Sequence, residues 1–158
     1  MFITVVIPLS DNHTPEVRSY NMSRIRSTNT KPEELIRKAL FKKGFRFRKN
    51  DKRYPGKPDI VLPKHKTIIF VNGCFWHMHD CPNFVFPKSR LDYWKPKLER
   101  NVQRDLKNYA DLKSQGWNII VVWECQLKKD VFDLTISEIT NSILNHSTDT
   151  ALRGVHKK

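Results

Sequence analysis

The hydrophobic and polar positions of residues 30–43 repeat with the spacing of an amphipathic α-helix. Thr30 stands at the position of an N-cap, Pro32 lies in the first turn, and Gly44 follows the last apolar position. The apolar residues of the expected buried face are Leu35, Ile36, Ala39 and Leu40. This pattern predicts a helix with defined ends that packs one side against a core.

The rest of the chain alternates between short apolar runs and longer helical patterns. Strands are predicted for residues 45–48, 59–62, 67–71 and 117–123. Helices are predicted for residues 89–116, with an interruption near Pro96, and for residues 130–146. The order helix, three strands, helix, strand, helix is typical of a layered α/β fold with a small mixed sheet.

Both ends of the chain differ from this pattern. Residues 10–29 are polar and basic, which predicts an arm or a short helix outside the core. We expect an N-terminal arm (residues 1–18), one domain (residues 19–146) and a disordered tail (residues 147–158). The apolar residues 1–9 are too few to cross a bilayer and lack the features of a signal peptide, so a cytoplasmic protein is expected.

Positive charge is the unusual feature of the composition. The chain has 29 Lys and Arg residues against 16 Asp and Glu residues, a formal net charge of +13. Basic residues are concentrated in residues 24–53, beginning with Arg24 and Arg26. We expect these side chains to bind nucleic-acid phosphates, although a merely soluble basic surface would show the same excess. A membrane surface is not expected, because no long basic amphipathic helix is present. The sequence shows no obvious apolar interface, which favours a monomer.

The segment NGCFWHMHDC gathers several potential metal ligands. A structural zinc ion takes four cysteine or histidine ligands in a tetrahedron. Cys74, His79 and Cys81 supply three of them, and Cys125, just past the last predicted strand, is the only other cysteine. His77 lies two residues from His79 and is an alternative ligand. Three unrelated buried cysteines would also fit this sequence, since cysteine is commonly buried as a small hydrophobic residue.

The remaining polar residues suggest a catalytic group. If zinc takes His79, then His77 is a free imidazole on a metal-fixed loop, as a general base for water would be. Asp59, at the start of a strand, is a candidate Mg²⁺ ligand, although most such aspartates are turn residues. Glu33 could add a carboxylate, but it also matches a capping box. Asp105 could orient an imidazole, or be an ordinary solvated helix residue.

Several motifs together resemble a known family. In order, they are RSYNMSRIRSTNTKPEELIRKAL, GKPDIVL, IIFVNGCFWHMHDC, KLERNVQRD and GWNIIVVWEC. They resemble the Vsr-type very-short-patch mismatch repair endonucleases over roughly residues 13–128. The resemblance implies a three-layer fold similar to the PD-(D/E)XK restriction endonucleases. It also implies a Mg²⁺-dependent enzyme that nicks double-stranded DNA 5′ of the thymine of a T·G mismatch, left by deamination of 5-methylcytosine. Other mismatch repair proteins are candidate partners.

The resemblance also implies roles for individual residues. It assigns Mg²⁺ to Asp59 and the backbone carbonyl of Val71, and it makes His77 the general base. Asp105 becomes the hydrogen-bonding partner of His77, and Glu33 becomes the acidic residue near the metal-bound waters. The implied zinc ligands are Cys74, His79, Cys81 and Cys125.

Three aromatic residues match a further feature of the family. Phe75, Trp76 and Trp94 correspond to side chains that wedge into the base stack beside the mismatch, while the N-terminal arm grips the DNA from the other side. Unstacking a base step costs a few kcal/mol, and it costs less at a mismatch. Without the resemblance, ordinary core packing would be the expected role of Phe75 and Trp76.

The sequence departs from the expected patterns at two points. Asn72 stands where the family pattern has a histidine. Its amide can hydrogen-bond a metal-bound water or a phosphate, so Asn72 stays a candidate catalytic residue, but an amide cannot exchange a proton at neutral pH. The carboxylate-x-lysine pair of PD-(D/E)XK nucleases is absent after Asp59, as it is in the family, which relies on His77 instead. Two other functions therefore stay open: a general PD-(D/E)XK nuclease without mismatch preference, and a zinc-containing DNA-binding module without catalysis.

Overall fold

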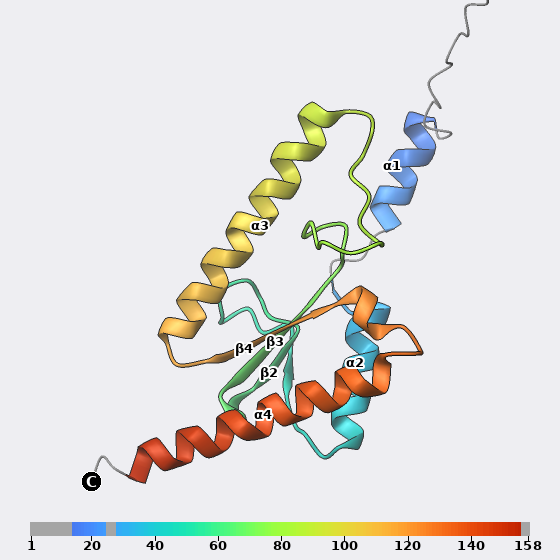
Figure 1. Ribbon diagram of the computed structural model, residues 1–158. Helices are drawn as coiled ribbons and strands as arrows, with labels where there is room; N and C mark the ends of the chain where they lie inside the picture. Colours follow the sequence, from blue (N-terminus) through green and yellow to red (C-terminus); the bar gives the residue numbers. More distant parts are fainter. Residues whose placement is uncertain (1–13, 25–27, 156–158) are drawn as a thin grey trace, which may run out of the picture.

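The computed structural model describes residues 14–24 and 28–155 (Figure 1). Residues 1–13 of the predicted arm, together with Arg26, lie outside the described residues. Helix α1 (Pro15–Arg24) contains the remainder of the polar N-terminal segment and is followed by α2 (Lys31–Lys42). The prediction of a short helix in the N-terminal segment is thereby confirmed.

A four-stranded mixed sheet forms the centre of the domain. Its strands are β1 (Arg48–Lys49), β2 (Ile60–Leu62), β3 (Thr67–Asn72) and β4 (Asn118–Trp123), in spatial order β1-β2-β3-β4. The first three strands pair antiparallel, whereas β3 and β4 pair parallel. A short turn joins β2 to β3, while α3 (Leu91–Ser114) lies between β3 and β4 in the chain, as a parallel connection requires. The predicted small mixed sheet is confirmed.

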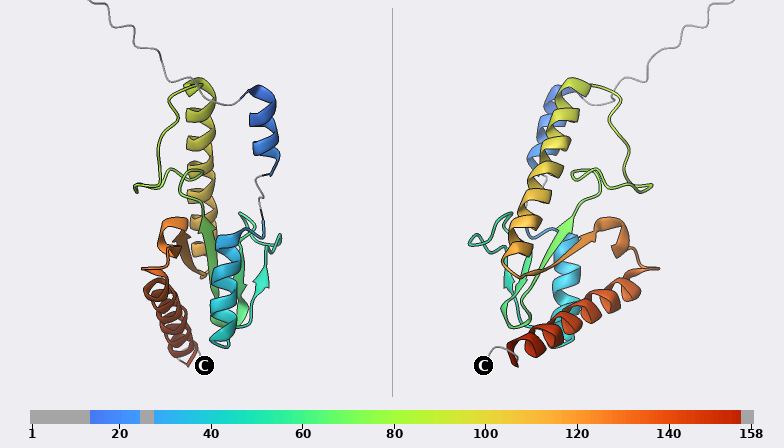
Figure 2. Two further views of the ribbon diagram at one scale, coloured as in Figure 1. Left: turned by 90° about the vertical axis from the view of Figure 1, so that its right-hand side faces the viewer. Right: turned by 60° about the vertical axis from the view of Figure 1, so that its left-hand side comes forward.

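Helices cover both faces of this sheet (Figures 1 and 2). Helix α2 and α4 (Phe132–Val155) share one hydrophobic cluster with Ile60 and Ile69. The neighbouring strand residues Val61 and Ile68 belong to a second cluster, with Leu112 of α3. Because successive strand side chains point to opposite faces, the paired strands β2 and β3 supply both clusters. The domain therefore has three layers, helices on either side of the sheet.

Three details of the predicted elements were wrong: the buried face of one helix, the extent of one strand and the interruption of another helix. Leu35 is 46% exposed, so the buried face of α2 is narrower than its apolar pattern. The strand expected at residues 45–48 is limited to Arg48–Lys49. Helix α3 runs through Pro96, because a proline removes one backbone bond while the rest of the helix stays packed through buried Leu98 and Leu112.

Helix α4 is longer than the helix predicted for residues 130–146, because it continues to Val155. The expected division into an arm, one domain and a tail from residue 147 stays a prediction. Among the described residues, no helix is both long and apolar enough to cross a membrane.

The segment between β3 and α3 lies at one end of the domain. Figures 1 and 2 show residues 73–90, the first turns of α3 and α1 at this same end, beyond the C-terminal end of β3. This arrangement collects most of the sequence motifs at one end of the sheet.

Candidate active site and metal centre

A pocket of about 570 Å³ opens at the end of β3, between the start of β2, α2 and α3. All six residues that the sequence analysis assigned to catalysis or to Mg²⁺ line it: Glu33, Asp59, Val71, Asn72, His77 and Asp105. They come from α2, the start of β2, the end of β3, the following loop and α3. The structure thus brings the predicted catalytic group together in one cavity.

Strand geometry explains part of this convergence. Phe70 belongs to the cluster that faces α3, and Asn72 lies two residues further along the same strand. Asp59 directly precedes β2 and lies two residues before Val61, which also faces α3. Alternation along a strand therefore places Asp59 and Asn72 on the side covered by α3, the helix that carries Asp105.

Asp59 is a half-buried carboxylate with few protein partners. Its Oδ2 accepts a hydrogen bond of 2.7 Å from the N–H of Val71. Burial raises the pKa of Asp59 to about 6, and the carboxylate of Glu33 adds to the rise, while the Val71 N–H, Arg37 and His77 oppose it. A divalent cation would stabilise the ionised carboxylate, so Asp59 fits a metal ligand. Coordination by the Val71 carbonyl stays a prediction.

Both carboxylate oxygens of Glu33 already accept hydrogen bonds from other groups of the protein. Its Oε1 accepts hydrogen bonds from the N–H (3.3 Å) and hydroxyl (2.9 Å) of Thr30. Its Oε2 accepts from the N–H of Asn29 (2.9 Å) and from Arg37 Nη2 (2.8 Å). The capping interpretation of Glu33 is confirmed, whereas its role beside metal-bound waters stays a prediction.

His77 and Asp105 form a directed pair. The Nδ1 atom of His77 contacts Oδ2 of Asp105, and Arg104 donates to Oδ1 of the same carboxylate at 3.2 Å. A carboxylate accepts only, so the neutral imidazole carries its proton on Nδ1 and keeps the lone pair on Nε2. Both side chains line the pocket, which fits the expected orientation of a general base by a carboxylate.

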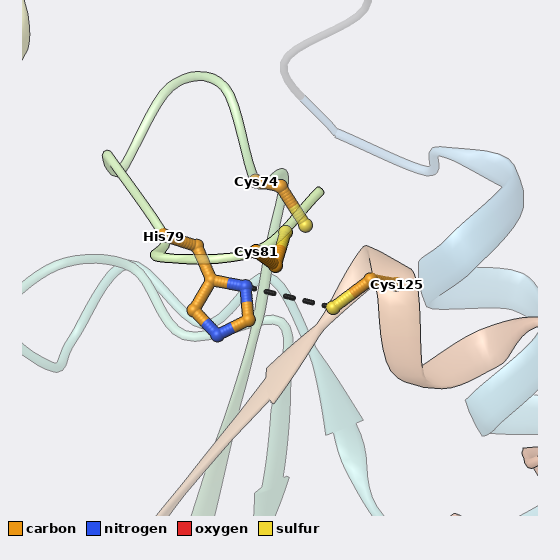
Figure 3. A group of neighbouring side chains, drawn as sticks. All are labelled: Cys74, His79, Cys81 and Cys125. Atoms are coloured by element: carbon orange, nitrogen blue, oxygen red, sulfur yellow. Dashed lines mark hydrogen bonds between the residues drawn. The ribbon is translucent and has the colours of Figure 1, made fainter. Parts of the chain in front are cut away.

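The four predicted zinc ligands form one cluster (Figure 3). Cys74, His79, Cys81 and Cys125 each offer a ligand atom, and these atoms all lie within 4.8 Å of one another. The Nδ1 atom of His79 is 3.5 Å from Sγ of Cys125. A tetrahedral zinc with ordinary Zn–S and Zn–N bonds separates such atoms by about 3.5 Å. The donor set and its spacing therefore fit a zinc ion.

The cluster also answers the question of the two histidines. His79, and not His77, belongs to it, and the His79 ring stacks on Trp123 at 4.0 Å and 3° between planes. Burial raises the pKa of the Cys74 thiol to about 12, a cost that a bound cation would offset by favouring the thiolate. His77 lies outside this cluster, and its side chain lines the pocket instead.

The candidate intercalating residues form an aromatic group near the pocket. The ring centroids of Phe75 lie 5.1 Å from Trp76 and 5.3 Å from Trp94. All three side chains are half-buried and belong to neither core cluster. Lys97 Nζ lies 5.4 Å from the Trp76 centroid and 5.3 Å from the Trp94 centroid. Core packing therefore does not account for them.

Arg24 is placed on α1, away from the sheet. Its guanidinium donates to the hydroxyl of Tyr20 at 2.9 Å and lies over the Tyr20 ring at 5.0 Å. The side chain is exposed, and its contact with DNA phosphates stays a prediction.

Comparison with known proteins decides the family. The family model described as DNA mismatch endonuclease Vsr matches residues 10–91, about half of the chain. A type II nicking enzyme of Neisseria meningitidis serogroup A, V.NmeAIP, is 53% identical over 120 residues, which cover 76% of this chain and 86% of that protein. The chain belongs to the Vsr family.

Other relatives agree with membership of the Vsr family. The nicking enzyme V.XorIIP of Xanthomonas oryzae pv. oryzae is 49% identical over 119 residues, 75% of this chain and 88% of that protein. The DNA mismatch endonuclease Vsr of Escherichia coli K12 is 38% identical over 120 residues, 76% of this chain and 77% of that protein. The family is one of DNA mismatch endonucleases, which supports a DNA endonuclease.

Sequence reasoning missed two supporting residues of this Vsr-family site. Arg37 is 6% exposed and donates to Glu33, to Asn29 Oδ1 and to the backbone carbonyl of Asp59, so it ties α2 to the start of β2. Tyr109 accepts a hydrogen bond from Asn72. Helical spacing could have found both, since Arg37 lies four residues after Glu33, and Tyr109 four residues after Asp105.

Replacement of Cys125 by serine is expected to release the metal. Serine keeps the size of the side chain but loses the thiolate that a tetrahedral zinc site requires. Elemental analysis should find about one zinc per wild-type chain and much less in Cys125→Ser, with a lower Tm. His77→Ala is the matched control, because His77 lies outside the cluster and its loss should leave the zinc content unchanged. Full retention of zinc and Tm in Cys125→Ser would exclude this ligand set.

Proposed function

We propose that this protein is a Mg²⁺-dependent endonuclease that nicks double-stranded DNA 5′ of the thymine of a T·G mismatch. Its fold is of the PD-(D/E)XK restriction-endonuclease type, and the Cys74/His79/Cys81/Cys125 cluster is a structural zinc site. The observation that carries the proposal is one pocket in which Asp59 and the His77–Asp105 pair lie next to Trp76. This pocket combines a cation ligand, a base and an aromatic side chain.

The His77–Asp105 pair supports phosphodiester hydrolysis. His77 Nε2 takes a proton from the attacking water, while Asp105 holds the Nδ1 proton and stabilises the imidazolium that forms. The water oxygen bonds to phosphorus, and the bond from phosphorus to the leaving sugar oxygen breaks as that oxygen takes a proton from solvent. Mg²⁺ bound at Asp59 would supply charge stabilisation for the phosphoryl oxygens.

The loop held by the cysteine cluster supports recognition of the mismatch. Cys74 and Cys81 flank the loop residues Phe75 and Trp76, and Asn101 donates a hydrogen bond of 3.2 Å to the Trp76 carbonyl. A loop fixed in this way loses little entropy when its aromatic rings enter a base stack. Stacking returns about 1–3 kcal/mol per base, which favours the step that costs least to open. A T·G step is easier to open than a matched one.

A nicking assay tests this function directly. Purified zinc-loaded protein is incubated with otherwise identical T·G and C·G duplexes, with Mg²⁺ or with EDTA, and each strand is labelled separately. We expect one nick, in the thymine strand of the T·G duplex, only with Mg²⁺. Equal cleavage of both duplexes would indicate a general nuclease, and binding without cleavage would indicate a non-catalytic DNA-binding module. Repetition over a library of flanking sequences would define the preferred site.

Trp76→Ala is expected to reduce mismatch discrimination more than general DNA affinity. The wedge acts only where a base step opens, whereas phosphate contacts hold any duplex. Loss of one stacked base should lower the T·G to C·G affinity ratio by about 10-fold, within the range measured for such substitutions. Fluorescence anisotropy with both duplexes measures this ratio. Trp117→Phe, a change in the second core cluster, is the control and should leave the ratio as in wild type.

A further inference from the structure

Asn72 is held by a residue that none of the motifs includes. It is the last residue of β3 and is 6% exposed. Its Nδ2 donates a hydrogen bond of 2.9 Å to the hydroxyl oxygen of Tyr109, which lies in α3. The bond therefore links the end of the central strand to the helix that carries Asp105.

Tyr109 is itself firmly placed. Its ring packs against Phe70 with centroids 4.9 Å apart, and it belongs to the second hydrophobic cluster. Its hydroxyl oxygen accepts the Asn72 proton while the ring is held by this packing.

In the orientation that the structure has, this bond leaves one end of the carboxamide available. With Nδ2 committed to Tyr109, the carbonyl Oδ1 is the atom of Asn72 left for the pocket that Asn72 and Asp59 both line. A neutral carbonyl oxygen is a normal ligand for a hard divalent cation or for its bound water. The Tyr109 hydroxyl can also donate, so it could bond to Oδ1 if the amide were rotated by 180°. That orientation would turn the NH₂ group toward the cation, which repels it, so a bound cation favours the observed orientation, in which Tyr109 accepts from Nδ2.

We infer that Tyr109 is a positioning residue, whose hydroxyl orients the Asn72 carboxamide so that Oδ1 faces the divalent cation held at Asp59. The inference rests on the proposed Mg²⁺ site and adds an oriented oxygen donor to it. Tyr109 does not touch the substrate or the cation in this arrangement. It acts on the metal only through Asn72.

Tyr109→Phe tests this role because it removes the hydroxyl and keeps the ring that packs on Phe70. Manganese, a spectroscopic substitute for Mg²⁺, is titrated into zinc-loaded protein bound to a T·G duplex with a nuclease-resistant linkage. Free Mn²⁺ is followed by electron paramagnetic resonance, with the duplex alone as background. We expect affinity to fall by about fivefold, the effect of losing one ordinary hydrogen bond. The Mg²⁺ concentration for half-maximal nicking should rise equally, while the rate at saturating Mg²⁺ stays within about twofold.

Tyr54→Phe is the matched control. Tyr54 packs against the same cluster, with its ring centroid 5.0 Å from that of Trp117. Tyr54→Phe also removes a tyrosine hydroxyl, but not the one that is bonded to Asn72. It should leave metal affinity and nicking unchanged. Thermal melting of both variants separates a loss of fold from a loss of the metal ligand.

A double-mutant cycle completes the test. Asn72→Ala should weaken Mn²⁺ binding, and adding Tyr109→Phe to it should change nothing further, because the hydroxyl acts only through Asn72. Additive effects of the two substitutions would overturn the inference, as would wild-type metal affinity in Tyr109→Phe. In either case Mg²⁺-dependent nicking by the wild type would leave the proposed function intact. A wild type that neither binds Mn²⁺ nor nicks would overturn both.

Discussion

Asp59→Ala should abolish nicking and leave binding of a T·G duplex unchanged or slightly tighter. The substitution removes the proposed ligand of Mg²⁺, and metal-ion catalysis contributes several kcal/mol of charge stabilisation. Since about 1.4 kcal/mol corresponds to a tenfold change in rate, the expected loss is at least about 10³-fold. Binding survives because a carboxylate close to phosphates also repels them. Single-turnover nicking and anisotropy measure the two effects.

Asp59→Asn provides the shape-matched control for this prediction. It should lose most of the nicking, because a neutral amide oxygen binds Mg²⁺ much more weakly than the carboxylate that it replaces. The partly desolvated carboxylate of Asp59 costs free energy when no cation is bound, as its raised pKa of about 6 indicates. Asp59→Asn should therefore melt above the wild type in metal-free buffer. Nicking by either variant at near wild-type rate would move the metal site elsewhere.

His77→Ala should lower the nicking rate by about 10²–10⁴-fold, the range for a lost general base. Zinc content should stay at one per chain, since His77 lies outside the ligand cluster. His79→Ala provides the comparison, because it should lose zinc and stability instead. Elemental analysis and nicking assays of both variants measure these outcomes. Zinc lost from His77→Ala and retained in His79→Ala would reverse the assignment.

Asp105→Asn should reduce nicking less than His77→Ala. The asparagine can still contact the imidazole Nδ1, but without a negative charge it stabilises the imidazolium less well. Asp111→Asn is the matched control, because Asp111 lies on the same helix and is exposed to solvent. Its rate should equal that of the wild type. An Asp105→Asn rate equal to that of the control would remove Asp105 from the mechanism.

The sequence by itself predicted most of the secondary structure and the polar residues that meet in the pocket and in the cysteine cluster. Helix α2 was predicted from its local spacing and from Pro32 and Gly44, which act through the backbone and need no distant partner. The short strands β2 and β3 followed from apolar runs joined by a turn. The cysteine cluster was predictable because few residue types bind zinc and the chain has only three cysteines.

Only the tertiary structure decided which of two nearby histidines, His77 or His79, belongs to the cysteine cluster. His77 and His79 are chemically identical and two residues apart, so the choice depends on the path of the loop and on the stacking of His79 against Trp123. The exposure of Leu35 was likewise undetermined, because helical periodicity defines a face but not the width of the surface that covers it.

The contact between Asn72 and Tyr109 required the fold as well. The two residues are far apart in the chain and meet because α3 crosses the face of the sheet on which Asn72 lies. Local pattern gives the direction of each side chain within its own element, but the distance between elements is set by the packing of the side chains between them. For this reason the sequence named Asn72 but not its partner Tyr109, which only the packing of α3 on the sheet brings into contact with it.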